Sequence, residues 1–172
     1  MKTLLDVLSS LIFFVTFSIA SSAQTADSTN GEVWILGSIP LQRLGIGIMD
    51  TGNTTVGIYA GIPLSDRSVF SLFVGYDRAL GTVQYQPENA ISLNIRFQSS
   101  GNRRSAEFGM LGVGTGISTP EAKSITTPLV QFAFGESLRL YDKHRILVLF
   151  RLQSFIGVRT LGQFAIGYSY TL

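Results

Sequence analysis

Asp50, Thr51 and Gly52 form the triplet in this sequence that most directly suggests chemistry. A carboxylate in such a setting can share a proton with a second carboxylate, and the pair then activates a water molecule. Asn53 follows the triplet, where that chemistry uses alanine or serine. Asp, Asn and Gly are also the residues that tight turns require. We therefore interpret residues 50–53 as a hairpin turn and not as a catalytic site.

His144 is the only histidine, and the chain has no cysteine. A histidine can serve as the base of a Ser–His–acid arrangement, so His144 stays open as an alternative catalytic residue. It directly follows Tyr141-Asp142-Lys143, which is a predicted turn. One histidine without cysteine argues against a transition-metal site. The sequence therefore predicts no metal centre.

Glycine alternates with other residues over 112–116. This segment lacks the Gly-x-Gly-x-x-Gly spacing of a phosphate-binding loop, because Ile117 occupies the final position, and no helix is predicted after it. Glycines within a strand more often relieve crowding or permit bending. We therefore expect no nucleotide and no other cofactor.

The overall charge is small, with 13 Lys and Arg residues against 11 Asp and Glu residues and a net charge of +2. The basic residues are scattered apart from Arg103-Arg104, so the sequence predicts no nucleic-acid partner. Charged residues make up 14% of the chain, whereas soluble domains carry about 25%. A hydrophobic chain with few charges and no long apolar helix is typical of transmembrane strands.

The N-terminus has the features of a cleaved signal peptide, which we assign to residues 1–23. Lys2 precedes a short apolar run at 11–19, and Ser21-Ser22-Ala23 supplies small residues before Gln24. An uncleaved N-terminal anchor is the alternative. A polar leader at 24–30 and a single domain at 31–172 complete the predicted organisation. Without cysteine, neither a disulfide nor a lipid-modified cysteine can hold the exported chain.

Turn-forming residues recur about every 10 to 15 residues after the leader, and no helical periodicity lies between them. This rhythm predicts an all-β fold, and we expect an antiparallel up-and-down β-barrel. Ten strands are preferred and eight are possible, because several early runs are shorter than the 9 to 11 residues that cross a bilayer. The candidate strands are 32–39, 44–49, 54–62, 68–76, 80–86, 90–98, 105–116, 127–140, 144–154 and 161–172.

Apolar and polar residues alternate within these runs, most clearly at 91–98 and 163–172. Successive side chains of a strand point to opposite faces, so each strand has one apolar and one polar side. We expect the apolar side to face lipid because it carries the large aromatic residues Phe70, Tyr76, Phe97, Phe132, Phe134, Phe150, Phe164, Tyr168 and Tyr170. We expect the opposite side, which faces the interior, to carry Asn94, Arg96, Gln131, Arg151, Gln153 and Gln163.

Two irregularities interrupt this alternation. Leu147 and Leu149 share the phase of Arg145 and Arg151. Glu136 shares the phase of Phe134, and this second irregularity suggests a bulge at Gly135. Buried charges need partners. We therefore predict an interior polar network, centred on Glu107, that fills the barrel, with a selectivity filter as the alternative. Its candidate members are Arg96, Glu107, Arg145 and Arg151.

The C-terminal strand carries apolar residues at every second position up to the last residue, namely Phe164, Ile166, Tyr168, Tyr170 and Leu172. This pattern resembles the signal that the barrel-assembly machinery reads in bacterial outer-membrane proteins, although that signal usually ends in Phe. The chain as a whole resembles the small outer-membrane β-barrels of eight or ten strands. The resemblance implies an outer-membrane location in a Gram-negative bacterium, surrounding lipid, and assembly through the barrel-assembly machinery.

Three functions follow as hypotheses. The leading one is a non-enzymatic outer-membrane barrel with a structural or surface-interaction role, whose extracellular partner is unknown. The first alternative is an outer-membrane lipid-modifying hydrolase, similar to lipid A deacylases, that uses His144. The second is a soluble periplasmic β-barrel that binds a small apolar ligand inside.

Overall fold

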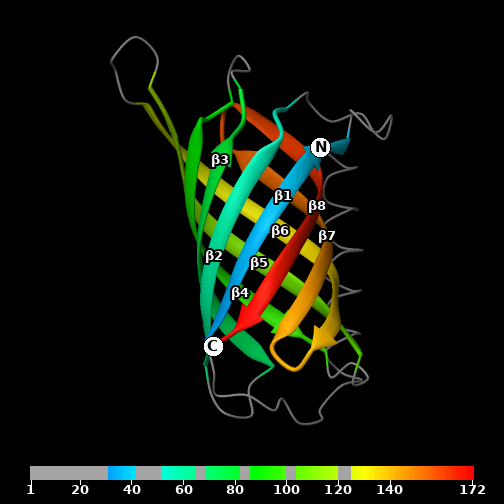
Figure 1. The fold of residues 1–172 in the computed structure, drawn as a ribbon. Coiled ribbons are helices and arrows are strands. Elements are labelled where there is room, and N and C mark those ends of the chain that lie inside the picture. Colours follow the sequence, from blue (N-terminus) through cyan, green and yellow to red (C-terminus); the bar gives the residue numbers. More distant parts are fainter. Residues whose placement is uncertain (1–30, 42–51, 65–68, 82–85, 100–103, 120–124) are drawn as a thin grey trace, which may run out of the picture.

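The computed structural model describes residues 31–41, 52–64, 69–81, 86–99, 104–119 and 125–172. These ranges form eight antiparallel strands in chain order (Figure 1). The strands are β1 Glu32–Pro40, β2 Thr55–Pro63, β3 Phe70–Ala79, β4 Asn89–Gln98, β5 Ser105–Ser118, β6 Ile125–Tyr141, β7 His144–Phe155 and β8 Arg159–Thr171. Each strand pairs with the next, and β1 pairs with β8, which closes an up-and-down barrel. The described residues include no helix long and apolar enough to span a membrane.

The preferred number of ten strands is therefore wrong, and the alternative of eight is correct. β1 pairs directly with β2, and β3 pairs directly with β4, so no further strand separates either pair in the sheet. The candidate at 44–49 lies outside the described residues, as do 82–85 of the candidate at 80–86. Both runs are short, and strand-like composition alone cannot decide whether a run joins the sheet.

The two ends of the barrel differ in what they carry. At the end we call the lower end, β1 begins, β8 finishes, and Asp142 and Lys143 connect β6 to β7 (Figure 1). At the upper end, β7 and β8 are joined by a short turn in which Gly157 adopts a φ of 80°. The paired ends of β5 and β6, at Ser118 and Ile125, extend beyond the upper rim (Figure 1).

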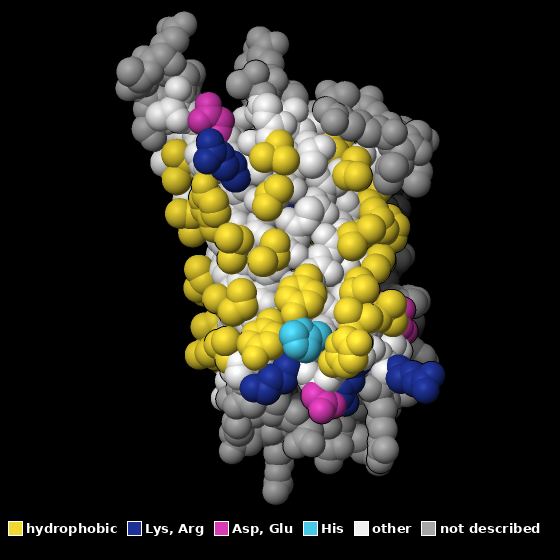
Figure 2. All heavy atoms as spheres, in the orientation of Figure 1, with side chains coloured by type: hydrophobic (Ala, Val, Ile, Leu, Met, Phe, Trp, Pro, Cys, Tyr) yellow, Lys and Arg dark blue, Asp and Glu magenta, His cyan; other side chains and the backbone are white. Residues whose placement is uncertain are grey.

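The outer wall of the barrel is apolar. Ile58, Val74 and Val113 have exposed fractions of 54%, 56% and 61%. All nine aromatic residues assigned to the outer side are exposed or half-buried there. Figure 2 shows the hydrophobic side chains covering the visible wall, with charged side chains near its two ends. This arrangement is the reverse of a water-soluble protein, in which the apolar side of each strand is covered.

Side chains fill the interior in layers. A lower apolar cluster contains Trp34, Leu36, Tyr59, Phe73, Phe108, Met110, Ala133, Leu147, Leu149 and Ala165. A smaller upper cluster contains Ala90, Leu129, Phe155 and Leu161. The two clusters together place five aromatic residues inward, which the assignment of aromatic residues to the outer side did not foresee. The shared phase of Leu147, Leu149 and Arg151 is no irregularity, because the interior itself alternates between apolar and polar layers.

The bulge predicted at Gly135 is absent. Pairing between β6 and β7 runs continuously through Gly135 and Glu136, and the register shift lies between Arg139 and Tyr141. Glu136 is exposed on the outer wall, in the same phase as Phe134. The alternation of β6 is therefore regular at this point, and the carboxylate of Glu136 lies on the outer side of the strand.

The fit of Tyr59 against Gly75 gives a first prediction. A Cβ atom on Gly75 would lie 2.3 Å from Cε1 of Tyr59. We expect Gly75→Ala to lower the free energy of unfolding by about 1–3 kcal/mol, because the tyrosine ring is enclosed and cannot move away. Urea unfolding in detergent, followed by tryptophan fluorescence, measures this loss.

Gly37→Ala is the matched control. Gly37 lies on the outer wall, and its Cβ would come no closer than 3.9 Å to the carbonyl oxygen of Ile166. Its effect should stay within about 0.5 kcal/mol. Equal losses in the two variants would show that interior crowding at Gly75 is unimportant.

Candidate functional site

Arg151 lies at the centre of a polar layer between the two apolar clusters. Its side chain has no exposed surface. Nη1 donates to Oδ1 of Asp77 at 2.8 Å and to the hydroxyl of Tyr59 at 2.5 Å. Nε and Nη2 donate to Gln163, and Nη2 also donates to Ser38 and Thr55, all at 2.7 to 2.9 Å. All three guanidinium nitrogens are therefore hydrogen-bonded, which a buried cation requires.

Asp77 is the carboxylate partner of Arg151, and its side chain is 5% exposed. The Tyr59 hydroxyl donates to Oδ2 of Asp77 at 2.6 Å, while it accepts from Arg151. Gln153 donates to the same carboxylate oxygen at 3.2 Å. The carboxylate, the phenol and the guanidinium thus close a small ring of charge-assisted hydrogen bonds inside the barrel.

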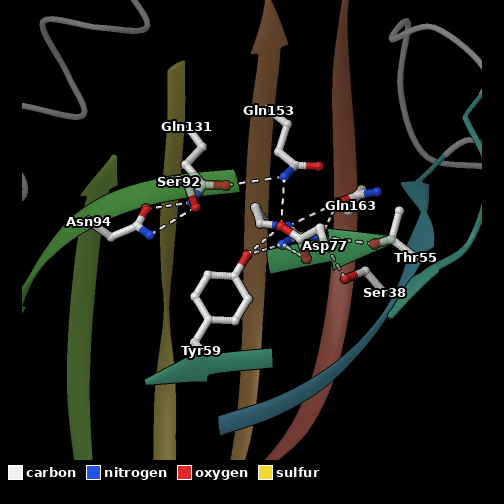
Figure 3. Close-up of polar contacts among 10 residues, drawn as sticks. Ser38, Thr55, Tyr59, Asp77, Ser92, Asn94, Gln131, Gln153 and Gln163 are labelled. Carbon is white, nitrogen blue, oxygen red and sulfur yellow. Dashed lines mark hydrogen bonds and ion pairs between the residues drawn. The ribbon is translucent and has the colours of Figure 1, made fainter. Parts of the chain in front are cut away.

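A chain of amide side chains extends this ring across the interior (Figure 3). Gln153 donates to Gln131 at 3.1 Å. Gln131 donates to Ser92 at 2.9 Å and also to Asn94. Asn94 in turn donates to Ser92 at 3.0 Å. These side chains converge from β4, β6 and β7, so the network spans the full width of the barrel.

Strand alternation brings these side chains together, and glycine leaves room for them. Ser71, Phe73, Gly75 and Asp77 all face the interior of β3. A Cβ on Gly57 of β2 would lie 2.3 Å from Oδ1 of Asp77. Two interior glycines, Gly57 and Gly75, therefore supply the space that the Asp77 and Tyr59 side chains occupy.

A second charged layer lies at the lower end. Arg96 contacts Glu32 at 2.6 Å, and both side chains are nearly buried. Its guanidinium also lies 4.9 Å from the ring of Phe73 and 5.2 Å from that of Trp34. Glu32 further accepts a hydrogen bond from Ser169. The lower apolar cluster therefore separates this layer from the Arg151 layer.

The predicted network members divide between three places. Arg151 is the centre of the middle layer, whereas Arg96 and Arg145 face the interior of the lower layer. Glu107 lies outside, so its predicted place at the centre of the network is wrong. Its chain neighbours Ala106 and Phe108 are buried, so alternation directs Glu107 to the outer wall, opposite the exposed Glu136.

The sequence interpretation missed Asp77, Tyr59 and Glu32 as interior polar residues. The candidate strand at 68–76 ended one residue before Asp77, although β3 continues to Ala79. The alternation of 70–76, if extended by one residue, places Asp77 in the interior phase of Ser71. Tyr59 gave no such signal, because its hydroxyl is polar while its ring belongs to the apolar cluster.

The other candidate residues do not form a reactive centre among the described residues. His144 is half-buried at the lower end, and its ring lies 5.2 to 6.2 Å from those of Tyr141, Tyr168 and Tyr170. Its Nδ1 is hydrogen-bonded with the Tyr168 hydroxyl. Asp50 and Thr51 lie outside the described residues, and residues 112–116 belong to β5.

Comparison with known proteins finds similar structures but no similar sequence. No protein-family profile matches the sequence, and no curated protein matches it either. The N-terminal β-barrel domain of Pseudomonas aeruginosa OprF is similar in structure, with a TM-score of 0.63 and 11% identity over 86% of this chain and 100% of that one. Neisserial surface protein A gives a TM-score of 0.56 with 11% identity, over 83% of this chain and 95% of that one.

The outer membrane protein Ail of Yersinia pestis is also similar, with a TM-score of 0.54 and 10% identity over 84% of this chain and 100% of that one. At these identities the likeness concerns the fold. The chain has the fold of the small eight-stranded outer-membrane β-barrels, as its C-terminal pattern and strand alternation predicted. No subfamily is defined.

The Arg151–Asp77 pair gives a second prediction. We expect Arg151→Met to lower the free energy of unfolding by about 3–5 kcal/mol, because it leaves Asp77 buried without its cation. The double variant Arg151→Met with Asp77→Leu should lose less than the single variant, since neither charge remains. Urea unfolding in detergent measures both.

Arg78→Gln is the control for loss of an arginine charge, because Arg78 is exposed beside Asp77 on the opposite face of β3. It should change the free energy of unfolding by less than about 0.5 kcal/mol. If the double variant were as unstable as Arg151→Met, an uncompensated Asp77 charge would not be the cause of the loss.

Proposed function

We propose that this protein is a non-enzymatic outer-membrane β-barrel of a Gram-negative bacterium, with a filled interior and a structural or surface-interaction role. One observation carries the proposal: the outer wall is apolar, while a fully buried ion pair and its hydrogen-bond network lie inside. Lipid solvates an apolar wall, and a closed barrel satisfies every strand edge within the bilayer.

The similar solved structures support the location. They include the outer membrane protein Ail and a barrel domain of OprF, and the proposal transfers their setting to this chain. In bacterial barrels with an even number of strands, both ends of the barrel chain face the periplasm. The lower end, where β1 begins and β8 finishes, is then periplasmic. The upper end, with the protruding β5–β6 hairpin, is extracellular and is the surface that a partner would meet.

The filled interior supports a structural role over transport. An apolar cluster, a hydrogen-bonded polar layer and a second apolar cluster follow one another along the axis. An eight-stranded barrel is just wide enough for side chains to fill it. Transport through the interior would require the Arg151 network to break, at the cost of an unpaired buried charge.

The C-terminal strand supports assembly by the barrel-assembly machinery. Ile166, Tyr168, Tyr170 and Leu172 all expose 36% or more of their surface on the outer wall. An insertion machinery could read this side of the strand before the barrel closes. In the closed barrel the strand is paired with both β7 and β1.

Purified outer membranes provide the direct test of location. We expect the chain in that fraction, with a band that migrates faster in SDS before boiling than after it, because folded barrels resist SDS at room temperature. Recovery in the soluble periplasm without detergent contradicts the proposal. Single-channel recording in planar bilayers should show no steady ion conductance.

Leu93→Arg tests whether the outer wall faces lipid. Leu93 is 49% exposed near the middle of β4. In a phospholipid bilayer we expect the substitution to lower the free energy of unfolding by about 2–4 kcal/mol, because arginine is costly at the bilayer centre. Reversible urea unfolding in phosphatidylcholine vesicles measures this loss.

Thr126→Arg is the matched control, because Thr126 is exposed on the protruding part of β6 at the upper end. It should change stability by less than about 0.5 kcal/mol. In a water-soluble barrel both arginines would face water, so equal small effects would favour the soluble ligand-binding alternative.

A further inference from the structure

Three arginines lie at the lower end of the barrel at inward-phase positions of their strands, and the side chain of Arg139 is 38% exposed. Arg96 lies near the end of β4, Arg139 near the end of β6 and Arg145 at the start of β7. Arg139 and Arg145 are direct partners across the two neighbouring strands. We call Arg96, Arg139 and Arg145 the lower arginine cluster.

The three members are unequally paired. Arg96 forms its ion pair with Glu32 at 2.6 Å, within the interior. Arg139 contacts Asp142 at 3.0 Å, but the Asp142 side chain is 99% exposed. Arg145 has one hydrogen bond among the described residues, from Nη1 to the neutral Ser137 hydroxyl at 3.3 Å. No carboxylate of the described residues therefore contacts the half-buried guanidinium of Arg145.

The charges around Arg145 are mostly of its own sign. Glu32 attracts Arg145 from a distance, whereas Arg96 and Arg139 both repel it. Glu32, the carboxylate of this layer, is already bound to Arg96 and to Ser169. The Nε of Arg96 is also buried, and no group among the described residues accepts its hydrogen bond. The cluster thus holds more donors and more positive charge than its own acceptors satisfy.

The lower apolar cluster closes the route to these arginines through the barrel interior. Trp34, Phe73 and Phe108 close the interior above Arg96. A hollow on the surface shares Arg139 with the cluster and is lined further by Arg104 and Asp142, with Leu140 and Tyr141. The arginine cluster therefore lies between the lower apolar cluster and the lower end of the barrel.

We propose that the lower arginine cluster binds a phosphate group at the mouth of the barrel. Guanidinium groups bind oxyanions through paired, charge-assisted hydrogen bonds, and a phosphate offers several oxygens to several arginines at once. One bound oxyanion balances the charge of Arg145 and accepts its unused donors. The phosphate group comes either from a free ion or from the headgroup of an anionic phospholipid. Phosphate binding at this cluster does not depend on the proposed outer-membrane location. Only the statement that the site faces the periplasm rests on that proposed function.

Trp34 provides a reporter, because it is the only tryptophan and its ring lies 5.2 Å from the Arg96 guanidinium. The chain is folded in a neutral detergent and titrated with inorganic phosphate, with chloride lowered to hold ionic strength constant. We expect a saturable change in Trp34 fluorescence and a rise in the temperature at which the heat-modifiable band shifts. Arg145→Gln should raise the half-saturating phosphate concentration by about tenfold or more, since it removes a charged donor.

Two further variants keep this result interpretable. Arg139→Gln should also weaken the phosphate response, whereas Arg78→Gln, which removes an exposed arginine near the upper end, should leave it unchanged. Without phosphate, Arg145→Gln should unfold at a temperature no lower than that of the native chain, because the variant loses a repelled cation. If Arg145 had only a structural role, Arg145→Gln would unfold at a lower temperature than the native chain. That result contradicts the proposal.

A second titration distinguishes the two sources of phosphate. In bicelles, phosphatidylglycerol replaces part of the phosphatidylcholine, and the same fluorescence is recorded. A response to phosphatidylglycerol without one to inorganic phosphate assigns the site to a lipid headgroup, and the converse assigns it to the free ion. The proposal is overturned if neither titration saturates, or if Arg145→Gln and the native chain respond alike.

Discussion

The rest of the barrel is organised around the buried guanidinium of Arg151. It extends from β7 and donates hydrogen bonds to side chains of β1, β2, β3 and β8. A buried cation that lost these partners would cost several kcal/mol, of order 3–5 in measured cases. The strands are therefore held in the one register that brings Asp77, Tyr59 and Gln163 to it. The same requirement explains why two interior glycines leave space for Asp77 and Tyr59.

The apolar clusters above and below make this network stronger. They exclude water from the Arg151–Asp77 pair, and charged hydrogen bonds are stronger where the local dielectric constant is low. The lower cluster has a second role, because Trp34 and Phe73 present their ring faces to Arg96. Apolar and charged layers are thus interdependent, and together they replace the continuous hydrophobic core of a soluble domain.

The lower end differs from the middle layer in how its charges are balanced. Around Arg151, every guanidinium nitrogen has a partner within the chain. In the lower arginine cluster, one carboxylate serves Arg96, while Arg145 contacts a hydroxyl. A guanidinium whose nitrogens are all hydrogen-bonded supports a fixed structure, whereas one with unused donors near the end of the barrel can accept a ligand. The two layers therefore suit different tasks within one barrel.

The sequence by itself determined the all-β class, the apolar outer side with its nine aromatic residues, and the inward direction of Arg96, Arg145 and Arg151. These features depend on alternation within one strand, which a single stretch of residues records. The tertiary structure alone decided the number of strands, the partner of each buried charge and the outward position of Glu107. Those depend on which strands pair and in what register, and hydrogen bonds between residues distant in the chain, such as Arg151 and Asp77, fix that register.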